Sequence, residues 1–180
     1  MLVVVDSIVL LLAGPAGAGK STLARAWCHT RLVAAHVQLD TVRDLLVQGL
    51  VDPRVVGEPG QAEQWQASVT ATCALVRSFA EFGIDVAVDD LILPADAEDV
   101  WQPMLNGLRT HLVVVLPSLD EALTRGRRRD KHVPERLVTS QHDGSARWPR
   151  QRQLNTTGQT VRESVNALLE RMSTPAAQWP

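Results

Sequence analysis

The sequence is poor in the side chains that proteins stack on nucleic-acid bases. Its 180 residues include no tyrosine and two phenylalanines, and aromatic residues make up 4% of the chain. The formal net charge is −2 at pH 7, so no excess of positive charge attracts phosphate backbones or anionic lipids. No apolar run reaches the length of about 20 residues that spans a membrane. We therefore expect neither a nucleic-acid partner nor a membrane partner.

Cysteine is also scarce, with Cys28 and Cys73 as the two examples. Both lie in apolar helical patterns and lack the spacing of a metal site or a disulfide framework, which favours free thiols in a reducing compartment. The first twelve residues are apolar, but Asp6 interrupts them and no basic region precedes them. This pattern predicts a core strand rather than a targeting signal, and hence a cytoplasmic protein, monomeric or homodimeric.

Short β-branched runs alternate with longer helical patterns, which is typical of βα units around a parallel sheet. Strands are expected at Ile8–Ala13, Ala35–Leu39, Asp85–Asp89, His111–Leu116 and Arg152–Asn155. Helices are expected at Lys20–Val33, Thr41–Gln48, Gln61–Phe82, Ala95–Leu108, Ser118–Arg129 and Thr160–Met172. The last two helices begin with Ser-Leu-Asp-Glu and Thr-Val-Arg-Glu, which fit the capping-box pattern. We expect one domain, 1–180, with an α/β fold of three layers and a five-stranded parallel sheet.

The stretch Gly14-Pro-Ala-Gly-Ala-Gly-Lys-Ser21 fits the phosphate-binding loop G-x-x-x-x-G-K-[ST] in full, between a strand and a helix. Backbone N–H groups of such a loop form an anion-binding nest, and the helix adds its positive end. Lys20 is expected to reach the β- and γ-phosphates, and Ser21 to bind Mg²⁺. The sequence thus predicts a P-loop NTPase fold that binds ATP and Mg²⁺. The nucleotide-binding residues expected from this loop are Gly14, Ala16, Gly17, Ala18, Gly19, Lys20, Ser21 and Thr22.

Three carboxylates follow expected strands, at the edge where α/β sheets place ligands. Asp40 is a candidate general base for an attacking hydroxyl group, although an aspartate there would also suit the N-cap of the next helix. Asp89 is a candidate to bind Mg²⁺ through water, or to bind substrate. Asp90 is a candidate substrate-binding residue, and an Asp pair that simply starts a turn remains the alternative. The D-x-x-G and N-K-x-D patterns of GTPases are absent from the sequence.

A second informative region is 125–152, which holds eight arginines in a chain that is slightly acidic overall. We expect it to form a basic lid over an anion. Arg125 and Arg129 lie one helical turn apart and share a face. Another excursion, about 48–65, is rich in glycine and proline. It offers Val51, Val55, Val56 and Trp65 as an apolar wall, with Arg54 as its only basic residue.

In order along the chain, GPAGAGKST, QLDTVRDLL, VAVDD, LPSLDEALTRGRRR and LNTTGQTVRESVNALL resemble the small P-loop kinases that phosphorylate hydroxyl groups. This group includes gluconate kinase, shikimate kinase and chloramphenicol phosphotransferase, with the kinase domain of polynucleotide kinase as a more distant relative. The resemblance implies that Arg125 and Arg129 act on the transferring phosphate, that Asn155 and Thr156 lie on the adenine side, and that Arg43 holds the acceptor.

The acceptor is expected to be a small molecule with a hydroxyl group, bound by Asp40, Arg43, Arg54, Asp89 and Asp90. Because the 48–65 segment is mostly apolar, an antibiotic-like or sugar-like alcohol fits it best, and antibiotic resistance is one possible role. Two alternatives remain open at this point. One is a kinase of polynucleotide 5′-hydroxyl ends, and the other is a non-catalytic ATP-binding regulator.

Overall fold

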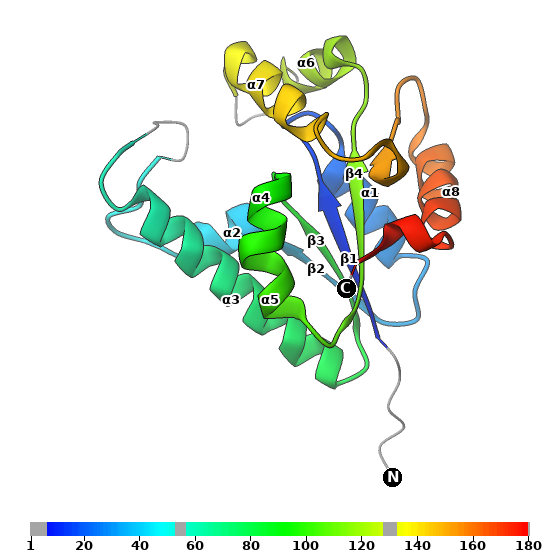
Figure 1. The fold of residues 1–180 in the computed structure, drawn as a ribbon, viewed down its shortest axis with the longest axis horizontal. Helices are drawn as coiled ribbons and strands as arrows, with labels where there is room; N and C mark the ends of the chain where they lie inside the picture. The colour runs from blue at the N-terminus through cyan, green and yellow to red at the C-terminus, as the bar shows by residue number, and fades with distance from the viewer. Residues whose placement is uncertain (1–6, 53–56, 128–132, 180) are drawn as a thin grey trace.

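The centre of the molecule is a mostly parallel sheet with helices on both faces (Figure 1). The computed structural model describes residues 7–52, 57–127 and 133–179. Five parallel strands lie in the order β2-β3-β1-β4-β5, and a sixth pairs with β4 in the antiparallel sense. The expected five-stranded parallel sheet is therefore confirmed, with β6 as an unexpected addition. The strands are β1 (Ile8–Ala13), β2 (Ala34–Gln38), β3 (Asp85–Asp89), β4 (Arg109–Val115), β5 (Gln153–Leu154) and β6 (Gln178–Trp179).

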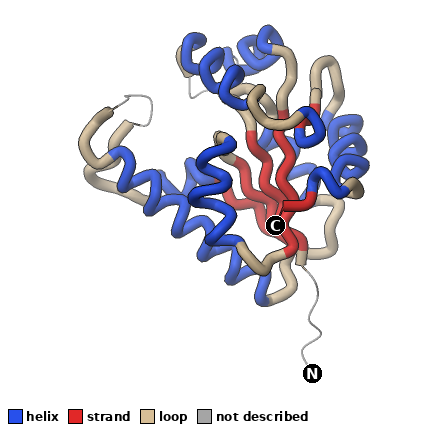
Figure 2. Tube along the Cα trace, in the orientation of Figure 1, coloured by secondary structure: helices blue, strands red, loops and turns tan. Residues whose placement is uncertain are grey.

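The helices form two outer layers and a cap over one edge of the sheet (Figure 2). Helices α1 and α8 cover one face, α3 and the α4–α5 segment cover the other, and α6 and α7 lie beyond the carboxyl ends of the strands. Within the described ranges, no helix is both long and apolar enough to cross a membrane. The helices are α1 (Lys20–Cys28), α2 (Leu39–Arg43), α3 (Gln61–Glu81), α4 (Pro94–Asp96), α5 (Gln102–Leu105), α6 (Leu119–Arg127), α7 (Glu135–Ser145) and α8 (Val161–Met172).

The core consists of two apolar clusters, one on each face of the sheet. Val9 and Leu11 of β1 belong to the cluster under α3, whereas Leu10 and Leu12 belong to the cluster under α1 and α8. This division follows from the two-residue period of a strand, which sends successive side chains to opposite faces. Because both faces are covered, β1 is a continuous apolar run, and it ends at the phosphate-binding loop.

The segment expected as one helix over Ala95–Leu108 is divided. Between α4 and α5 the backbone forms a π-helical segment, Ala97–Trp101. Pro103 lies at the start of α5, where it cannot donate a backbone hydrogen bond and its ring crowds the carbonyl group of the preceding turn. The apolar periodicity of the sequence agrees with a helical segment here, but the local backbone requirement of proline interrupts the regular helix.

Two other helices are shorter than expected. α1 ends at Cys28 rather than Val33, and the hydroxyl group of Thr30 donates to the carbonyl oxygen of Trp27 at 2.7 Å. α2 ends at Arg43 rather than Gln48, and the side chains of Leu45 and Val47 that follow it are exposed. Without burial of an apolar face, a short helix gains little stability from extension.

The two predicted capping boxes have different outcomes. The box of α8 is complete, because Thr160 and Glu163 bond each other's backbone N–H groups. At α6, Ser118 accepts from the backbone N–H of Glu121 at 3.3 Å, but the Glu121 carboxylate binds Arg125 and the backbone N–H of Gly158 instead. In the second capping box, contacts of the Glu121 carboxylate with Arg125 and Gly158 thus replace its bond to the backbone N–H of Ser118.

Candidate active site

The phosphate-binding loop joins β1 to α1 at the carboxyl edge of the sheet. Its path requires glycine at two points. A Cβ atom on Gly14 would lie 2.3 Å from the carbonyl oxygen of Val115, and one on Gly17 would lie 2.1 Å from that of Ala122. The loop is therefore held between β4 and α6, with no room for a side chain at either point.

Lys20 begins α1 and folds back over the loop. Its Nζ donates to the carbonyl oxygens of Gly14 and Pro15 at 2.8 and 2.9 Å. The preceding residue, Gly19, has a φ of 92° and provides no side-chain cap, and the first turn of α1 contains no acidic residue. The positive end of the helix and the ammonium group thus face the same space, which suits a polyanion.

Asp89 connects the loop to a histidine that the sequence reasoning missed. Ser21 Oγ donates to Asp89 Oδ2 at 2.6 Å, and His36 Nε2 lies 2.6 Å from Asp89 Oδ1. Burial alone would raise the pKa of Asp89, but the hydrogen bonds from His36 and Ser21 and the charge of Lys20 outweigh it and lower the pKa. Asp89 is thus held as a carboxylate beside a hydroxyl group, and both supply the oxygen ligands that Mg²⁺ prefers.

The pKa of Asp90 is shifted in the opposite direction to that of Asp89. Its Oδ2 is buried and has no hydrogen-bond partner. Burial raises its pKa to about 7, and the charges of Asp40 and Asp89 add to this effect, while the backbone N–H of Leu91 and the charge of Lys20 oppose it. Asp40, Asp89, Asp90 and Lys20 lie near one edge of the sheet, because Asp89 at the end of β3 is in register with Leu12 of β1 and Gln38 of β2.

Asp90 therefore predicts a pH dependence of stability. The folded chain holds this proton to about pH 7, whereas an unfolded aspartate releases it near 3.8, so the free energy of unfolding falls as the pH rises through this window. We expect Asp90→Asn to remove this fall in the free energy of unfolding. At pH 8 the variant should be more stable than the wild type by about 2 kcal/mol. The two proteins should differ little near pH 4. Urea denaturation of the nucleotide-free proteins at both pH values measures this difference.

The matched control is Asp120→Asn, which removes an exposed carboxylate from α6. We expect its stability difference from the wild type to be the same at both pH values. A difference for Asp90→Asn that does not change with pH would contradict the assignment of a raised pKa.

Asp40 and Arg43 lie one turn apart on α2. Asp40 is exposed and belongs to the first turn, while the N-cap is Gln38, which makes no side-chain cap. The alternative that Asp40 serves as an N-cap is therefore wrong, because the helix begins at Leu39, two residues before the expected start at Thr41. Arg43 is buried, and its Nη2 donates to the carbonyl oxygen of Val51 at 3.2 Å.

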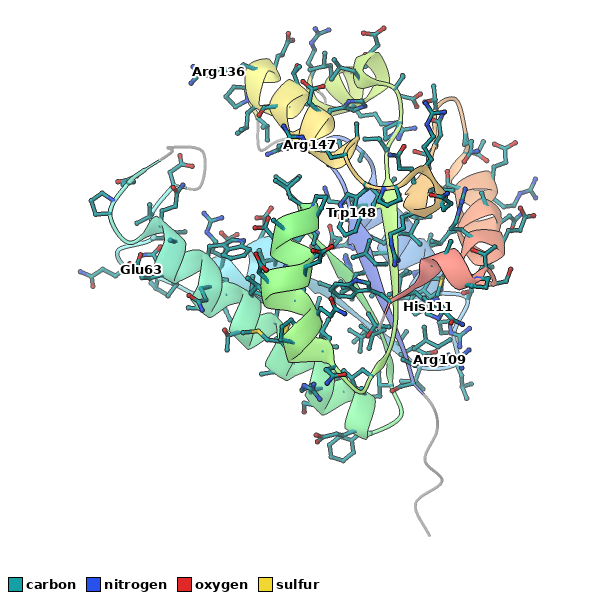
Figure 3. The ribbon with its side chains drawn as sticks, in the orientation of Figure 1. Glu63, Arg109, His111, Arg136, Arg147 and Trp148 are labelled. Atoms are coloured by element: carbon teal, nitrogen blue, oxygen red, sulfur yellow. The ribbon has the colours of Figure 1, made fainter. Side chains whose placement is uncertain are left out.

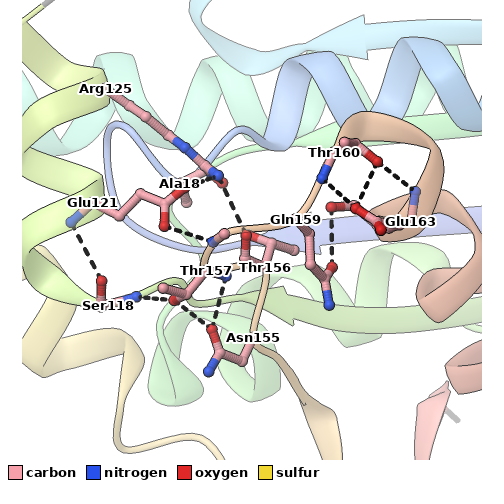
Figure 4. Close-up of polar contacts among 12 residues, drawn as sticks. Ala18, Ser118, Glu121, Arg125, Asn155, Thr156, Thr157, Gln159, Thr160 and Glu163 are labelled. Carbon is pink, nitrogen blue, oxygen red and sulfur yellow. Dashed lines mark hydrogen bonds and ion pairs between the residues drawn. The ribbon is translucent and has the colours of Figure 1, made fainter.

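Arg125 links the lid region to the nucleotide side of the loop (Figure 4). It pairs with the Glu121 carboxylate and donates to the carbonyl oxygens of Ala18 and Thr156, each at 3.3 Å. These contacts bridge the phosphate-binding loop and the segment after β5.

A pocket of about 200 Å³ lies beside Arg125. Thr22 and Thr156 line it, as expected for nucleotide-binding residues, and Thr156 Oγ1 is buried without a hydrogen-bond partner. Asn155 does not line the pocket; its Oδ1 accepts from the backbone N–H and the hydroxyl group of Thr157. The remaining lining residues are Ala18, Gly19, Leu23, Val115, Gln159, Val161 and Ser164.

The lid helix α7 touches the phosphate-binding loop directly, through a residue that the site prediction did not include. The backbone N–H of Ala16 donates to Gln141 Oε1 at 2.9 Å. At the end of the lid, buried Trp148 donates its indole N–H to the carbonyl oxygen of Ile92 at 3.0 Å, whereas Arg136 points outward from the lid (Figure 3). The lid is thus anchored by neutral groups, and not by its arginines alone.

Two predicted site residues, Arg54 and Arg129, lie outside the described residues. Among the described residues, no group of three or more His, Cys, Asp or Glu side chains could hold a metal ion by itself.

Comparison with known proteins identifies one family match. A family model described as an AAA domain matches residues 9–151. No curated protein matches the sequence.

Several solved structures share the fold. A sugar kinase from Janibacter sp. has a TM-score of 0.66 at 15% identity, with 96% of this chain and 97% of that chain covered. The tunicamycin resistance protein of Deinococcus radiodurans has a TM-score of 0.66 at 19% identity, and the match covers 97% of this chain and 99% of that chain. The APS kinase of Mycobacterium tuberculosis, in complex with AMPPNP and APS, has a TM-score of 0.66 at 13% identity, and the match covers 94% of this chain and 99% of that chain. These matches confirm the predicted resemblance to small P-loop kinases at the level of the fold.

Proposed function

Because this chain belongs to the AAA-domain family and carries a complete phosphate-binding loop, we propose that it is an ATP-dependent kinase of small molecules. It transfers the γ-phosphoryl group to a hydroxyl group of an antibiotic-like or sugar-like acceptor. One observation carries the proposal: the ends of β1, β2 and β3 lie side by side, because Asp89 is in register with Leu12 of β1 and Gln38 of β2. The phosphate-binding loop, Asp40 and the Asp89–Asp90 pair therefore lie at one edge of the sheet. This edge also holds the loop and lies beneath the lid.

Each group has a part in the transfer. The loop N–H groups, the α1 terminus and Lys20 hold the phosphates and stabilise the charge that develops on them. Asp40 accepts the proton of the acceptor hydroxyl group as its oxygen bonds to the γ-phosphorus. The bond from that phosphorus to the bridging oxygen breaks, and ADP leaves. Arg125 holds the nucleotide against the loop.

Ser21 and Asp89 would hold Mg²⁺, Asp89 through water. Their hydroxyl and carboxylate oxygens are adjacent, and His36 orients the carboxylate from its other side. A bound Mg²⁺ would neutralise charge on the phosphates. With two protein groups at hand, the other ligands would be phosphate oxygens and water, as is usual for this ion.

The test is ADP release with and without Mg²⁺ against a panel of acceptors. The panel holds sugar acids such as gluconate, aminoglycosides, chloramphenicol, tunicamycin, shikimate, nucleosides and oligonucleotides with 5′-hydroxyl ends. We expect Mg²⁺-dependent release with at least one small molecule. Binding of ATP without release for any acceptor would instead favour a regulatory protein, and release with oligonucleotides alone would favour an end kinase.

A further inference from the structure

Helix α7 carries a glutamine on the face that packs against the rest of the molecule. Gln141 lies between Val138 and Ser145, whose side chains are 1% and 0% exposed. Residues at these spacings of three and four share one face of a helix. A polar side chain on such a face needs a hydrogen-bond partner. Gln141 has its partner in the phosphate-binding loop, because its Oε1 accepts from the backbone N–H of Ala16 at 2.9 Å.

The peptide bond that joins Pro15 to Ala16 lies between Gln141 and Lys20. Its N–H group donates to Gln141 Oε1, and its carbonyl oxygen accepts from Lys20 Nζ at 2.9 Å. The two groups belong to one planar unit. Hydrogen bonds in a chain polarise one another, so a peptide whose N–H group is bonded is a better acceptor at its carbonyl oxygen. One rigid group thus connects the lid helix to the lysine of the loop.

Other contacts hold the lid helix in place independently of this glutamine (Figure 1). His142 Nε2 lies 2.9 Å from the carbonyl oxygen of Pro117, which follows β4. Just after α7, the indole N–H of Trp148 donates to the carbonyl oxygen of Ile92, which follows β3. Loss of the Gln141 contact should therefore disturb the loop after β1 more than the position of the helix.

We propose that Gln141 is a positioning residue for phosphoryl transfer. It fixes the Pro15–Ala16 peptide, and through this peptide it holds the ammonium group of Lys20 where charge develops on the transferring phosphoryl group. The inference rests on the proposed kinase function and adds to it a neutral residue of the lid. A charge that is held in advance stabilises the transition state more than one that must first be oriented. Nucleotide binding depends on the other N–H groups of the loop and on the α1 terminus as well, and should change little.

Gln141→Leu tests this role, because leucine suits a helix and has no group that accepts a hydrogen bond. Single-turnover measurements at saturating ATP, with an acceptor found by the panel, should show transfer slowed about tenfold. The affinity for AMPPNP should stay within about twofold of the wild-type value. Gln151→Leu, at an exposed glutamine beyond α7, is the matched control and should change neither quantity.

Two kinetic outcomes would overturn the proposal. Transfer by Gln141→Leu at the wild-type rate would show that the contact does not position the lysine. Tighter binding of AMPPNP to the variant would show instead that Gln141 competes with the nucleotide for the N–H group of Ala16.

Amide hydrogen exchange at Ala16 measures the contact itself and needs no acceptor. In the nucleotide-free protein, this amide should exchange roughly tenfold or more faster in Gln141→Leu than in the wild type. Gln141→Glu keeps an acceptor oxygen and should restore the slow exchange. The urea midpoints should stay close to the wild-type value, because His142 and Trp148 still hold the helix. Equal exchange in the wild type and Gln141→Leu, or a slower transfer matched by a large fall in the urea midpoint, would overturn the positioning role.

The two readouts separate this inference from the proposed function. If the wild type releases ADP with no acceptor of the panel, the kinase function fails and the positioning role fails with it, although the exchange result for Ala16 still stands. If the wild type transfers the phosphoryl group and Gln141→Leu does so equally fast, the kinase function stands and the inference alone is overturned.

Discussion

Lys20→Ala should lower the rate of phosphoryl transfer by about 10³-fold. The Nζ of Lys20 lies on the carbonyl oxygens of Gly14 and Pro15, within the loop that is proposed to hold the phosphates. Its charge also helps to lower the pKa of Asp89 and limits the rise in the pKa of Asp90. Loss of one positioned cation at the developing charge costs about 10²–10³ in rate, and the loss of its effect on Asp89 adds to this. Single-turnover measurements with saturating ATP give the change in the chemical step.

Arg25→Ala is the matched control for Lys20→Ala, because it removes an exposed cation from the same helix. We expect it to leave the transfer rate unchanged. Circular dichroism and the urea midpoint of both variants show whether the loop still folds. Wild-type turnover in a folded Lys20→Ala protein would contradict the assignment of the loop as the phosphate site.

Asp40→Asn should lower transfer by about 10²–10⁴-fold, which is the usual contribution of a general base. The affinity for AMPPNP should stay close to that of the wild type, because Asp40 lies on α2, outside the phosphate-binding loop. Asparagine keeps the size of the side chain but cannot accept the proton. Measurement of kcat separately from the nucleotide Kd distinguishes a chemical role from a binding role.

The control for Asp40→Asn is Asp44→Asn, the same change at the C-cap of α2, four residues further along the chain. It should retain at least half of the wild-type rate. Equal losses of transfer rate and nucleotide affinity in Asp40→Asn would contradict its assignment as the base. A loss of rate in Asp90→Asn, with Asp40→Asn unaffected, would move that role to the end of β3.

Much of the site was predictable because it depends on local patterns at strand ends. β1 and β3 have the expected bounds, since each is an apolar run that ends at polar or glycine residues. Because parallel strands end at one edge, residues that follow β1, β2 and β3 were expected to meet there. The register of the strands agrees with that expectation, because Asp89 of β3 lies opposite Leu12 of β1 and Gln38 of β2.

Other features of the site could not be found in this way, because they join distant segments through single side chains. Ala16 and Gln141 are 125 residues apart, and His36 and Asp89 are 53 apart. The periodic pattern of apolar residues along the sequence does not predict such a contact. The signals available for these two residues were weak: one histidine within an apolar strand and one glutamine in the lid helix.

The sequence by itself therefore determined the α/β class, the phosphate-binding loop and the acids at the strand ends, because these follow from local backbone geometry and alternating burial. Only the tertiary structure decided the electrostatic state of each group. Hydrogen bonds from His36 and Ser21 lower the pKa of Asp89, whereas burial raises the pKa of its neighbour Asp90 to about 7. Arg43 is buried without a carboxylate partner in the described chain. The physical reason is that the pKa of a group and the pairing of a charge depend on the water and charges around it in space. Packing sets these surroundings, and order along the chain does not.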